Sequence, residues 1–410
     1  MFCMRRQRAM AAALALALVG GVSLVLAPVA AAEPCGGLPG TGIDGTGFPG
    51  QPPAGRQGPV PAYNGPSTST VGWVTGQESV NRTFDRFGIS GTDLGISWDN
   101  GAGQTLMAFG DTFGNCAVPG GQWRHNVLLR SNDTDLSDGI TFADGVPGDV
   151  NSGAVVAGND PRFATQLLSA LGLSPLEYTI VPTSAIAVNG VQYLHFMSVR
   201  EWSGSVWSTN YAGIATSRDN GQTWFPEPGT IRFNSGVTVP GTEQLDARFQ
   251  QAAFVRGQDG FVYHYGTPNG RLGAAYLARV APDAMLDLTR YEYWNGGSWS
   301  SDLAAAAPVV GQPVGEMSVA WNAYLDRYIM LYGNDVEGRI MARTASAPEG
   351  PWSAPTALVV NNDIGNYPGG GLYAPYIHPR SAGDSLYFTA SQYSSYNVIL
   401  MRTDLDSLPR

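Results

Sequence analysis

Residues 217–224 read Ser-Arg-Asp-Asn-Gly-Gln-Thr-Trp and fit the pattern S-x-D-x-G-x-T-W. In such a stretch the Asp219 carboxylate can accept hydrogen bonds from turn amides, and Gly221 can adopt a positive φ. Trp224 would then pack between neighbouring sheets. The stretch therefore predicts a tight turn between two antiparallel strands, which gives Asp219 a structural rather than a catalytic use.

The surrounding pattern recurs along the chain: an apolar or alternating strand, a tight turn, and further strands rich in aromatic and aliphatic residues. Five segments show it, at residues 91–114, 182–224, 248–299, 316–352 and 372–404. Radial repetition of antiparallel sheets predicts an all-β fold, a five-bladed β-propeller. The stretch at 217–224 resembles the turn between outer strands of sialidase-type propeller blades. A double-sheet sandwich is the competing architecture, and the repeat count argues against it.

The N-terminal segment resembles an export signal. Arg5, Arg6 and Arg8 precede an apolar run at 11–26, and the alanines at 30–32 form a small-residue cleavage site. We therefore expect a signal peptide at 1–32, with an uncleaved membrane anchor as the alternative. After cleavage the protein would be secreted or cell-wall associated, without stable membrane insertion.

The mature chain is expected to have two parts. Residues 33–70 are rich in Gly, Pro, Ser and Thr and predict a flexible linker, and residues 71–410 form the propeller domain. Short helices are expected only near 161–171 and 301–307. A strand within 71–83 should close the ring by pairing with the C-terminal segment. The domain is expected to be monomeric.

The net charge of −10 argues against nucleic acid or anionic lipid as a partner and is compatible with a neutral polysaccharide. Signal cleavage would leave Cys35 and Cys116, which suggests one disulfide in an oxidising compartment. The histidines show no metal-binding spacing, so we expect no metal or other cofactor.

Two aspartates stand out as candidate catalytic groups. Asp93 lies in Gly-Thr-Asp-Leu-Gly (91–95) and Asp111 in Phe-Gly-Asp-Thr-Phe-Gly (109–114). The first opens one strand and the second closes its antiparallel neighbour, so a hairpin brings both carboxyl groups to the same end of the sheet. Paired carboxyl groups suit acid/base hydrolysis of a glycosidic bond. The alternative is that both are turn aspartates.

A third acid, Glu316, precedes the apolar strand Met-Ser-Val-Ala-Trp. It is expected on the wall opposite the aspartates, where it would serve as the general acid of an inverting reaction while the aspartates share the work of the base. The alternative assignment makes Asp111 the acid and Asp93 the base. An ion pair with Arg248 or Arg271 is the structural alternative. Substrate-binding candidates close to these acids or at the starts of inner strands are Arg124, Asn126, Gln250 and Tyr373.

Several motifs together resemble glycoside hydrolase family 183, the endo-D-arabinanases, formerly a family of unknown function: GTDLG (91–95), FGDTFG (109–114), WRHNVLLRSND (123–133), RFQQAAFV (248–255), YGTPNGR (265–271), GEMSVAWN (315–322) and GGLYAPYIHP (370–379). The resemblance implies a secreted, actinobacterial type of five-bladed propeller. It implies cleavage of internal α-D-arabinofuranosyl linkages in arabinogalactan and lipoarabinomannan, with Asp93 and Asp111 as the principal catalytic carboxylates.

Two other functions compete with this hypothesis. A non-catalytic cell-wall polysaccharide-binding propeller, a lectin, could use the same scaffold because fold does not determine function. Converging carboxyl groups favour the enzyme. A sialidase-like exo-enzyme would need three clustered arginines and a tyrosine nucleophile, which the sequence does not assign.

Overall fold

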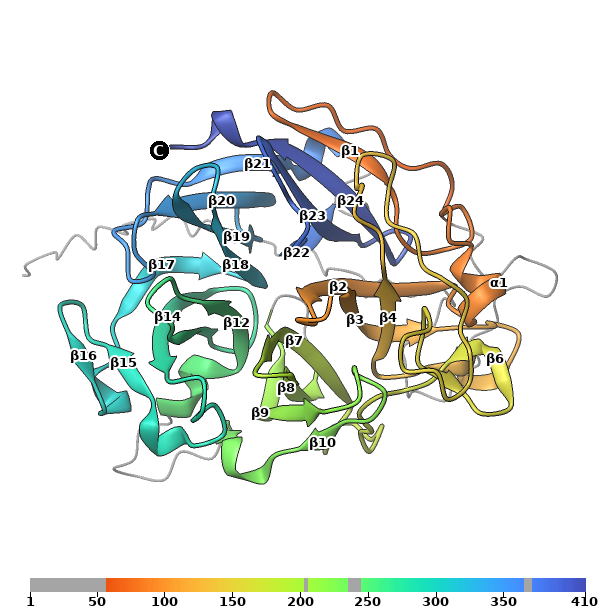
Figure 1. The fold of residues 1–410 in the computed structure, drawn as a ribbon, viewed down its shortest axis with the longest axis horizontal. Coiled ribbons are helices and arrows are strands. Elements are labelled where there is room, and N and C mark those ends of the chain that lie inside the picture. Colours follow the sequence, from red (N-terminus) through yellow and green to blue (C-terminus); the bar gives the residue numbers. More distant parts are fainter. Residues whose placement is uncertain (1–56, 203–205, 235–244, 365–370) are drawn as a thin grey trace, which may run out of the picture.

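The computed structural model describes residues 57–202, 206–234, 245–364 and 371–410. Almost all regular structure in these ranges is β-strand, arranged as five antiparallel sheets around a central axis (Figure 1). The predicted all-β, five-bladed propeller is confirmed. The expected signal peptide and Cys35 lie outside the described residues.

Each blade begins with a strand that faces the axis, and these five strands contact one another around the ring. They are β2 (Gly91–Asp99), β7 (Thr179–Val188), β12 (Gln251–Arg256), β18 (Met317–Asn322) and β22 (Leu372–Ile377). The second strands are β3 (Thr105–Phe113), β8 (Val191–Glu201), β13 (Val262–Thr267), β19 (Arg327–Asn334) and β23 (Ser385–Gln392). The third strands are β4 (Val127–Ser131), β9 (Ser208–Ser217), β14 (Gly273–Val280), β20 (Arg339–Ala345) and β24 (Asn397–Asp404).

Outer strands complete most blades. They are β1 (Thr68–Trp73), β10 (Phe225–Pro226), β11 (Arg232–Phe233), β15 (Glu292–Trp294), β16 (Trp299–Ser300), β17 (Pro308–Val314) and β21 (Thr356–Val360). A separate two-stranded sheet joins β5 (Val156–Ala157) to β6 (Asp160–Ala164). Apolar side chains of neighbouring blades pack face to face; Trp98 of the first blade, for example, packs in one core with Phe196 of the second.

The ring closes through the N-terminal strand. β1 pairs antiparallel with β24, from Thr68 opposite Thr403 to Trp73 opposite Ile399. The two ends of the domain thus share the fifth blade, and β24 has a partner on both sides. The predicted pairing of an N-terminal strand with the last blade is confirmed, but the strand spans Thr68–Trp73 and so lies mostly before the expected range of 71–83.

The folded part starts earlier than the boundary expected at residue 71. β1 already begins at Thr68, and Tyr63 is buried against the fourth and fifth blades, where its hydroxyl accepts the Val360 N–H at 3.1 Å. The part of the expected linker that includes Tyr63 is therefore packed against the domain, although its composition is rich in Gly, Pro, Ser and Thr. One buried aromatic ring and backbone pairing were enough to order it.

The turn at residues 217–224 has the expected geometry. Asp219 Oδ1 accepts hydrogen bonds from Ser217 Oγ at 2.8 Å and Thr223 N–H at 2.9 Å. Gly221 has φ of 76°, and Trp224 is buried in the core between the first two blades. Asp219 therefore stabilises the turn from β9 to β10.

Helical structure is limited in the described residues. The expected helix near 161–171 is instead occupied by β6 and irregular backbone, and only a single 3₁₀ turn, Leu303–Ala305, forms near 301–307. Helix α1 (Thr83–Phe87) was not predicted. No helix in the described ranges is long and apolar enough to cross a bilayer.

Cys116 is disulfide-bonded, and its expected partner Cys35 lies outside the described residues.

Candidate active site

Asp93 and Asp111 lie on the neighbouring strands β2 and β3, near the same end of their hairpin. The pairing is interrupted by bulges around Leu94, where Leu94 and Gly95 have φ of 73° and 77°. The Leu94 N–H donates to Ser391 Oγ of β23 at 2.7 Å, so the fifth blade holds the bulge in place. A bulge redirects the adjacent side chain, and here that side chain is Asp93.

Asp93 is surrounded by protein. Its Oδ2 accepts a hydrogen bond from the Tyr373 hydroxyl at 2.9 Å. Its Oδ1 is buried, accepts no hydrogen bond from the described residues, and lies directly against the α-carbon of Gly110. Burial, followed by the charge of Asp111, raises the pKa of Asp93 to about 8, although the Tyr373 hydrogen bond opposes the shift. Asp93 is therefore protonated at neutral pH.

Asp111 is buried and accepts more hydrogen bonds from the protein than Asp93 does. Trp123 Nε1 donates to Asp111 Oδ1 at 2.8 Å, and Thr179 Oγ1 donates to the same oxygen at 2.7 Å. Burial raises the pKa of Asp111 to about 6, while these two hydrogen bonds counteract it. Asp111 is therefore mostly ionised at neutral pH, and its Oδ2 is left free of both bonds.

His125 supports this carboxylate indirectly. Its Nδ1 lies 3.2 Å from Thr179 Oγ1. Because Thr179 donates its hydroxyl hydrogen to Asp111, it must accept from His125, which assigns the proton to Nδ1. Burial lowers the pKa of His125 to about 4, so the ring is neutral. His125 therefore acts here as a neutral hydrogen-bond donor.

Glu316 is held by an arginine. The guanidinium of Arg271 contacts both of its carboxylate oxygens, with N–O distances of 2.6, 2.8 and 3.1 Å. Such a bidentate, charge-assisted contact engages both carboxylate oxygens of Glu316 and fixes their orientation. The ion pair named as the structural alternative for Glu316 is present, and its partner is Arg271 rather than Arg248.

Arg271 is buried among aromatic rings. Its guanidinium lies 5.1 Å from the ring of Trp207 and 5.0 Å from that of Tyr373, and Nη1 donates to the Tyr393 hydroxyl at 2.5 Å. Burial alone would lower the pKa of Arg271, but Glu316, Tyr393 and Asp335 raise it well above its usual value. The rings of Tyr373 and Tyr393 stack at 4.2 Å, so the ion pair is packed against the tyrosine that bonds Asp93.

All five blades contribute to this end of the propeller. The contributing residues, from the first blade to the fifth, are Asp93 in β2, Thr179 in β7, Arg271 between β13 and β14, Glu316 before β18, and Tyr373 in β22. The three acids predicted to lie near one another interact electrostatically, because the charges of Asp111 and Glu316 both raise the pKa of Asp93. Arg271 is the central residue missing from the predicted site, although the sequence indicated it as a candidate partner of Glu316.

Two predicted substrate ligands have structural uses. Arg124 is buried, with its guanidinium donating to backbone carbonyls of Gly88, Gln122 and Ala164 and its face packed on Phe163. The Asn126 side chain is fully buried and bonds four backbone groups of residues 167, 168 and 180. The Asn126 amide therefore has no donor left for a sugar hydroxyl. Each guanidinium nitrogen of Arg124 already donates to a backbone carbonyl, so its side chain is tied to the protein interior.

Gln250 likewise lies in the interior. Its amide bonds the carbonyls of Arg232 and Asp246 and the hydroxyl of Thr209. Of the four predicted substrate ligands, Tyr373 alone contacts one of the three acids, Asp93, directly.

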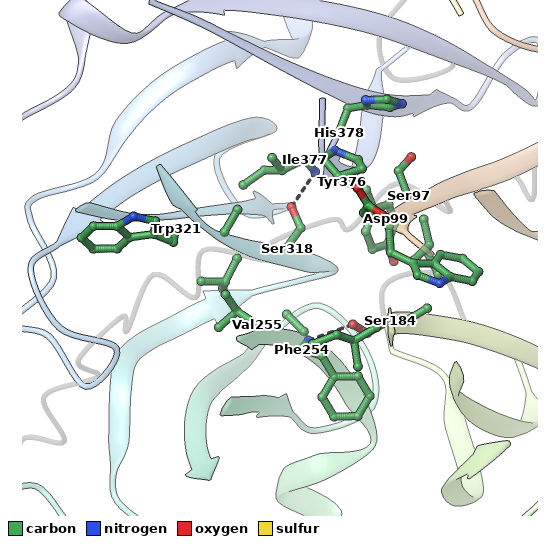
Figure 2. A pocket seen from close by; sticks show the side chains of 18 of the residues that line it. Ser97, Asp99, Ser184, Phe254, Val255, Ser318, Trp321, Tyr376, Ile377 and His378 are labelled. Carbon is green, nitrogen blue, oxygen red and sulfur yellow. Dashed lines mark hydrogen bonds between the residues drawn. The ribbon is translucent and has the colours of Figure 1, made fainter. Parts of the chain in front are cut away.

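The axis behind the acids contains a cavity of about 350 Å³ (Figure 2). It is lined by the later halves of the inner strands, such as Ile96–Asp99 of β2, whereas Asp93 lies nearer the start of that strand. The hydroxyls in its wall join blades: Ser184 Oγ accepts the Phe254 N–H at 2.8 Å, and Ser318 Oγ accepts the Ile377 N–H at 3.0 Å. In the described part of the chain, no group of three or more His, Cys, Asp or Glu side chains is placed to hold a metal ion.

Solved structures with a similar fold include a putative hydrolase from Bacteroides ovatus ATCC 8483, with a TM-score of 0.50 and 15% identity over 78% of this chain and 87% of that one. The α-L-arabinofuranosidase PaAbf62A from Podospora anserina, solved with cellotriose, gives a TM-score of 0.45 and 12% identity over 84% and 97% of the two chains. At such identities the likeness concerns the fold alone.

Two curated relatives are fungal. Notoamide biosynthesis cluster protein J' of Aspergillus versicolor is 32% identical over 76% of this chain and 83% of its own length. Notoamide biosynthesis cluster protein J of Aspergillus sp. (strain MF297-2) is 29% identical over 78% and 84%. A protein-family model described as a domain of unknown function matches residues 78–402. The chain therefore belongs to the DUF4185 family.

Proposed function

We propose that the protein is a secreted glycoside hydrolase of the family 183 type, an endo-D-arabinanase that cuts internal α-D-arabinofuranosyl linkages of cell-wall arabinogalactan and lipoarabinomannan. One observation carries the proposal: Asp93 and Asp111 lie at the same end of one hairpin in different surroundings, which raise their pKa values to about 8 and about 6. When the surroundings of two acids give them different pKa values, the acid with the higher pKa can serve as the proton donor and the other as the carboxylate. A lectin has no need of such a pair.

Asp93 is the general acid in this proposal. Being protonated at neutral pH, it can transfer its proton to the leaving glycosidic oxygen. The Tyr373 hydroxyl orients its carboxyl group through Oδ2. The Arg271–Glu316 pair keeps Tyr373 and Tyr393 stacked behind Asp93, which makes Arg271 and Glu316 positioning residues.

Asp111 is the ionised partner. Trp123 and Thr179 fix its Oδ1, which leaves Oδ2 to attack the anomeric carbon or to activate water. In one of the two inverting assignments expected from the sequence, Glu316 was the distant acid; in the other, Asp111 was the acid and Asp93 the base. With acid and carboxylate on adjacent strands, whose facing side chains start about 5 Å apart, the layout suits a retaining enzyme, in which the carboxyl groups are about 5–5.5 Å apart. We therefore propose retention through a glycosyl-enzyme formed on Asp111.

The test is incubation of the folded protein with purified arabinogalactan, with released oligosaccharides followed by chromatography and their first-formed anomer by NMR. Oligosaccharides of several lengths carrying the substrate's anomeric configuration are expected. Asp93→Asn and Asp111→Asn, which keep the shape of the site, should each lower kcat/KM by about 10²–10⁴. Binding of the polymer without any release by the wild type would favour the lectin instead.

A further inference from the structure

A second cavity, of about 300 Å³, lies between the third and fourth blades. Four aromatic side chains contribute to its lining: Tyr263, Trp299, Trp321 and Tyr328. Trp299 and Trp321 are both half-buried, so parts of their rings remain accessible. Trp321 also lines the axial cavity, at whose edge Figure 2 shows it. We call this cavity the interblade groove.

The interblade groove is remote from the acids. Glu316 precedes β18 and Trp321 lies near its end, five residues later, which corresponds to about 17 Å along a strand. The groove also takes in Gln258, from the turn between β12 and β13, and that turn follows the end of an inner strand. The groove therefore lies on the face of the propeller opposite the acids.

Polar side chains with unused hydrogen-bonding capacity surround the aromatic rings. Gln258 and Ser346 are exposed and Glu349 is half-buried. None of these three side chains forms a hydrogen bond or ion pair with the described residues. An accessible aromatic surface with free amide, hydroxyl and carboxylate groups around it matches a sugar ring, which has apolar faces and a rim of hydroxyls.

The charges of the groove favour a neutral sugar. Its one arginine, Arg279, is already paired with Glu292 at 2.8 Å and covers the ring of Trp299 at 4.2 Å. Asp259 accepts the Tyr263 hydroxyl at 2.8 Å, and Glu349 adds a second carboxylate. No cation among the described residues of the groove is therefore left to pair with a phosphate, sulfate or uronate, and two carboxylates would repel one.

We propose that the interblade groove is a second carbohydrate-binding site, which takes a short stretch of neutral polysaccharide. Its identification with arabinan rests on the proposed function, but sugar binding at the groove does not. A site of this kind tethers the enzyme to its polymer and raises the effective substrate concentration at the acids on the other face.

The experiment is calorimetric titration of Asp111→Asn protein with short neutral arabinofuranosyl oligosaccharides, which gives the number of sites directly. Two sites are expected, one of which is lost in the Trp321→Ala background. Gln258→Ala and Glu349→Gln should weaken that site about 3- to 10-fold. Tyr324→Ala, in the turn after β18 but outside the groove, is the matched control and should keep both sites.

An unchanged second site in folded Trp321→Ala, Gln258→Ala and Glu349→Gln proteins would overturn the proposal, as would equal binding of oligogalacturonate. Failure of the two proposals can be told apart. If the wild type hydrolyses arabinan but the titration finds a single site that Trp321→Ala does not affect, the groove proposal alone is wrong. Trp321-dependent binding of a neutral glycan panel without any arabinan hydrolysis would remove the proposed function alone.

Discussion

At the scale of single residues, Asp93 and Asp111 differ because of what surrounds them. Asp111 is buried and Asp93 is half-buried with its Oδ1 enclosed, and Asp111 accepts two hydrogen bonds on one oxygen, from Trp123 and Thr179. Asp93 accepts one, from Tyr373, and the neighbouring charge of Asp111 raises its pKa. Hydrogen bonds to a carboxylate favour its ionised form, and a nearby like charge disfavours it. Two acids of the same hairpin are thereby given opposite protonation states at neutral pH.

The pH profile of kcat/KM should be bell-shaped. Activity rises as Asp111 ionises near pH 6 and falls as Asp93 loses its proton near pH 8. Tyr373→Phe removes a hydrogen bond that lowers the pKa of Asp93, so the alkaline limb should move upward by about 0.5–1 pH unit. Steady-state kinetics across both limbs would measure the two midpoints. An alkaline limb that stays in place, or moves down, would contradict the role given to Tyr373.

Gly110 controls the space available to Asp93. A β-carbon at this position would overlap Asp93 Oδ1 and lie 3.0 Å from Leu94 Cδ1. Gly110→Ala should therefore displace the acid and lower kcat/KM by about 100-fold while the fold persists. Gly311→Ala is the control, because a β-carbon added there would meet nothing within 4 Å. Equal kinetics for the two variants, with unchanged circular dichroism, would show that Asp93 is not where catalysis needs it.

At the scale of elements, contacts between blades place the catalytic groups. The bulge of β2 is held by Ser391 of β23, and the ion pair joins Arg271, between β13 and β14, to Glu316, before β18. Removing one partner of a buried ion pair leaves a buried charge uncompensated, whereas replacing both by apolar groups is often neutral. The pair therefore couples the stability of two blades to the geometry of the site.

Glu316→Gln should lower the free energy of unfolding by about 3–5 kcal/mol. Both side chains of the pair are less than one-tenth exposed, so solvent screens them little. The paired replacement Arg271→Met with Glu316→Leu is the control and should lose less than the single variant. Urea titration followed by fluorescence would compare them. A wild-type midpoint for Glu316→Gln would mean that the pair contributes little to stability.

At the scale of the whole molecule, the propeller is a ring whose last blade is completed by its first strand. Because β1 covers β24, that strand does not present an open edge. An unpaired edge strand is a template for aggregation. Closure also matters for the site, since Tyr373 and Ser391 belong to the fifth blade and contact Asp93 and Leu94 of the first.

Deletion of residues 57–73, which removes β1 and keeps Cys35, should lower the melting temperature sharply and cause aggregation. The undeleted protein is the control. Thermal unfolding with light scattering would compare the two proteins. Equal melting temperatures would show that the ring does not depend on β1.

The sequence by itself determined the fold class, the five repeated segments and the hairpin that carries Asp93 and Asp111. These features depend on local signals: alternating apolar residues, glycine and asparagine at turns, and short loops that force neighbouring strands to pair. The Asp219 turn could be predicted for the same reason. The closure of the ring was inferred instead from a strand-like segment that precedes the first complete repeat. Local composition predicted the start of the domain too late, because Tyr63 is held in place by packing against blades that are distant in the sequence.

Only the tertiary structure decided what each polar side chain contacts. Arg124, Asn126 and Gln250 have the chemistry of sugar ligands, yet the fold directs their donors to buried backbone carbonyls. Arg271 and Glu316 are distant in sequence, and their bond changed the expected acid into a fixed carboxylate. Burial and long-range contacts set protonation and hydrogen bonding, and neither is encoded in the neighbours of a residue along the chain.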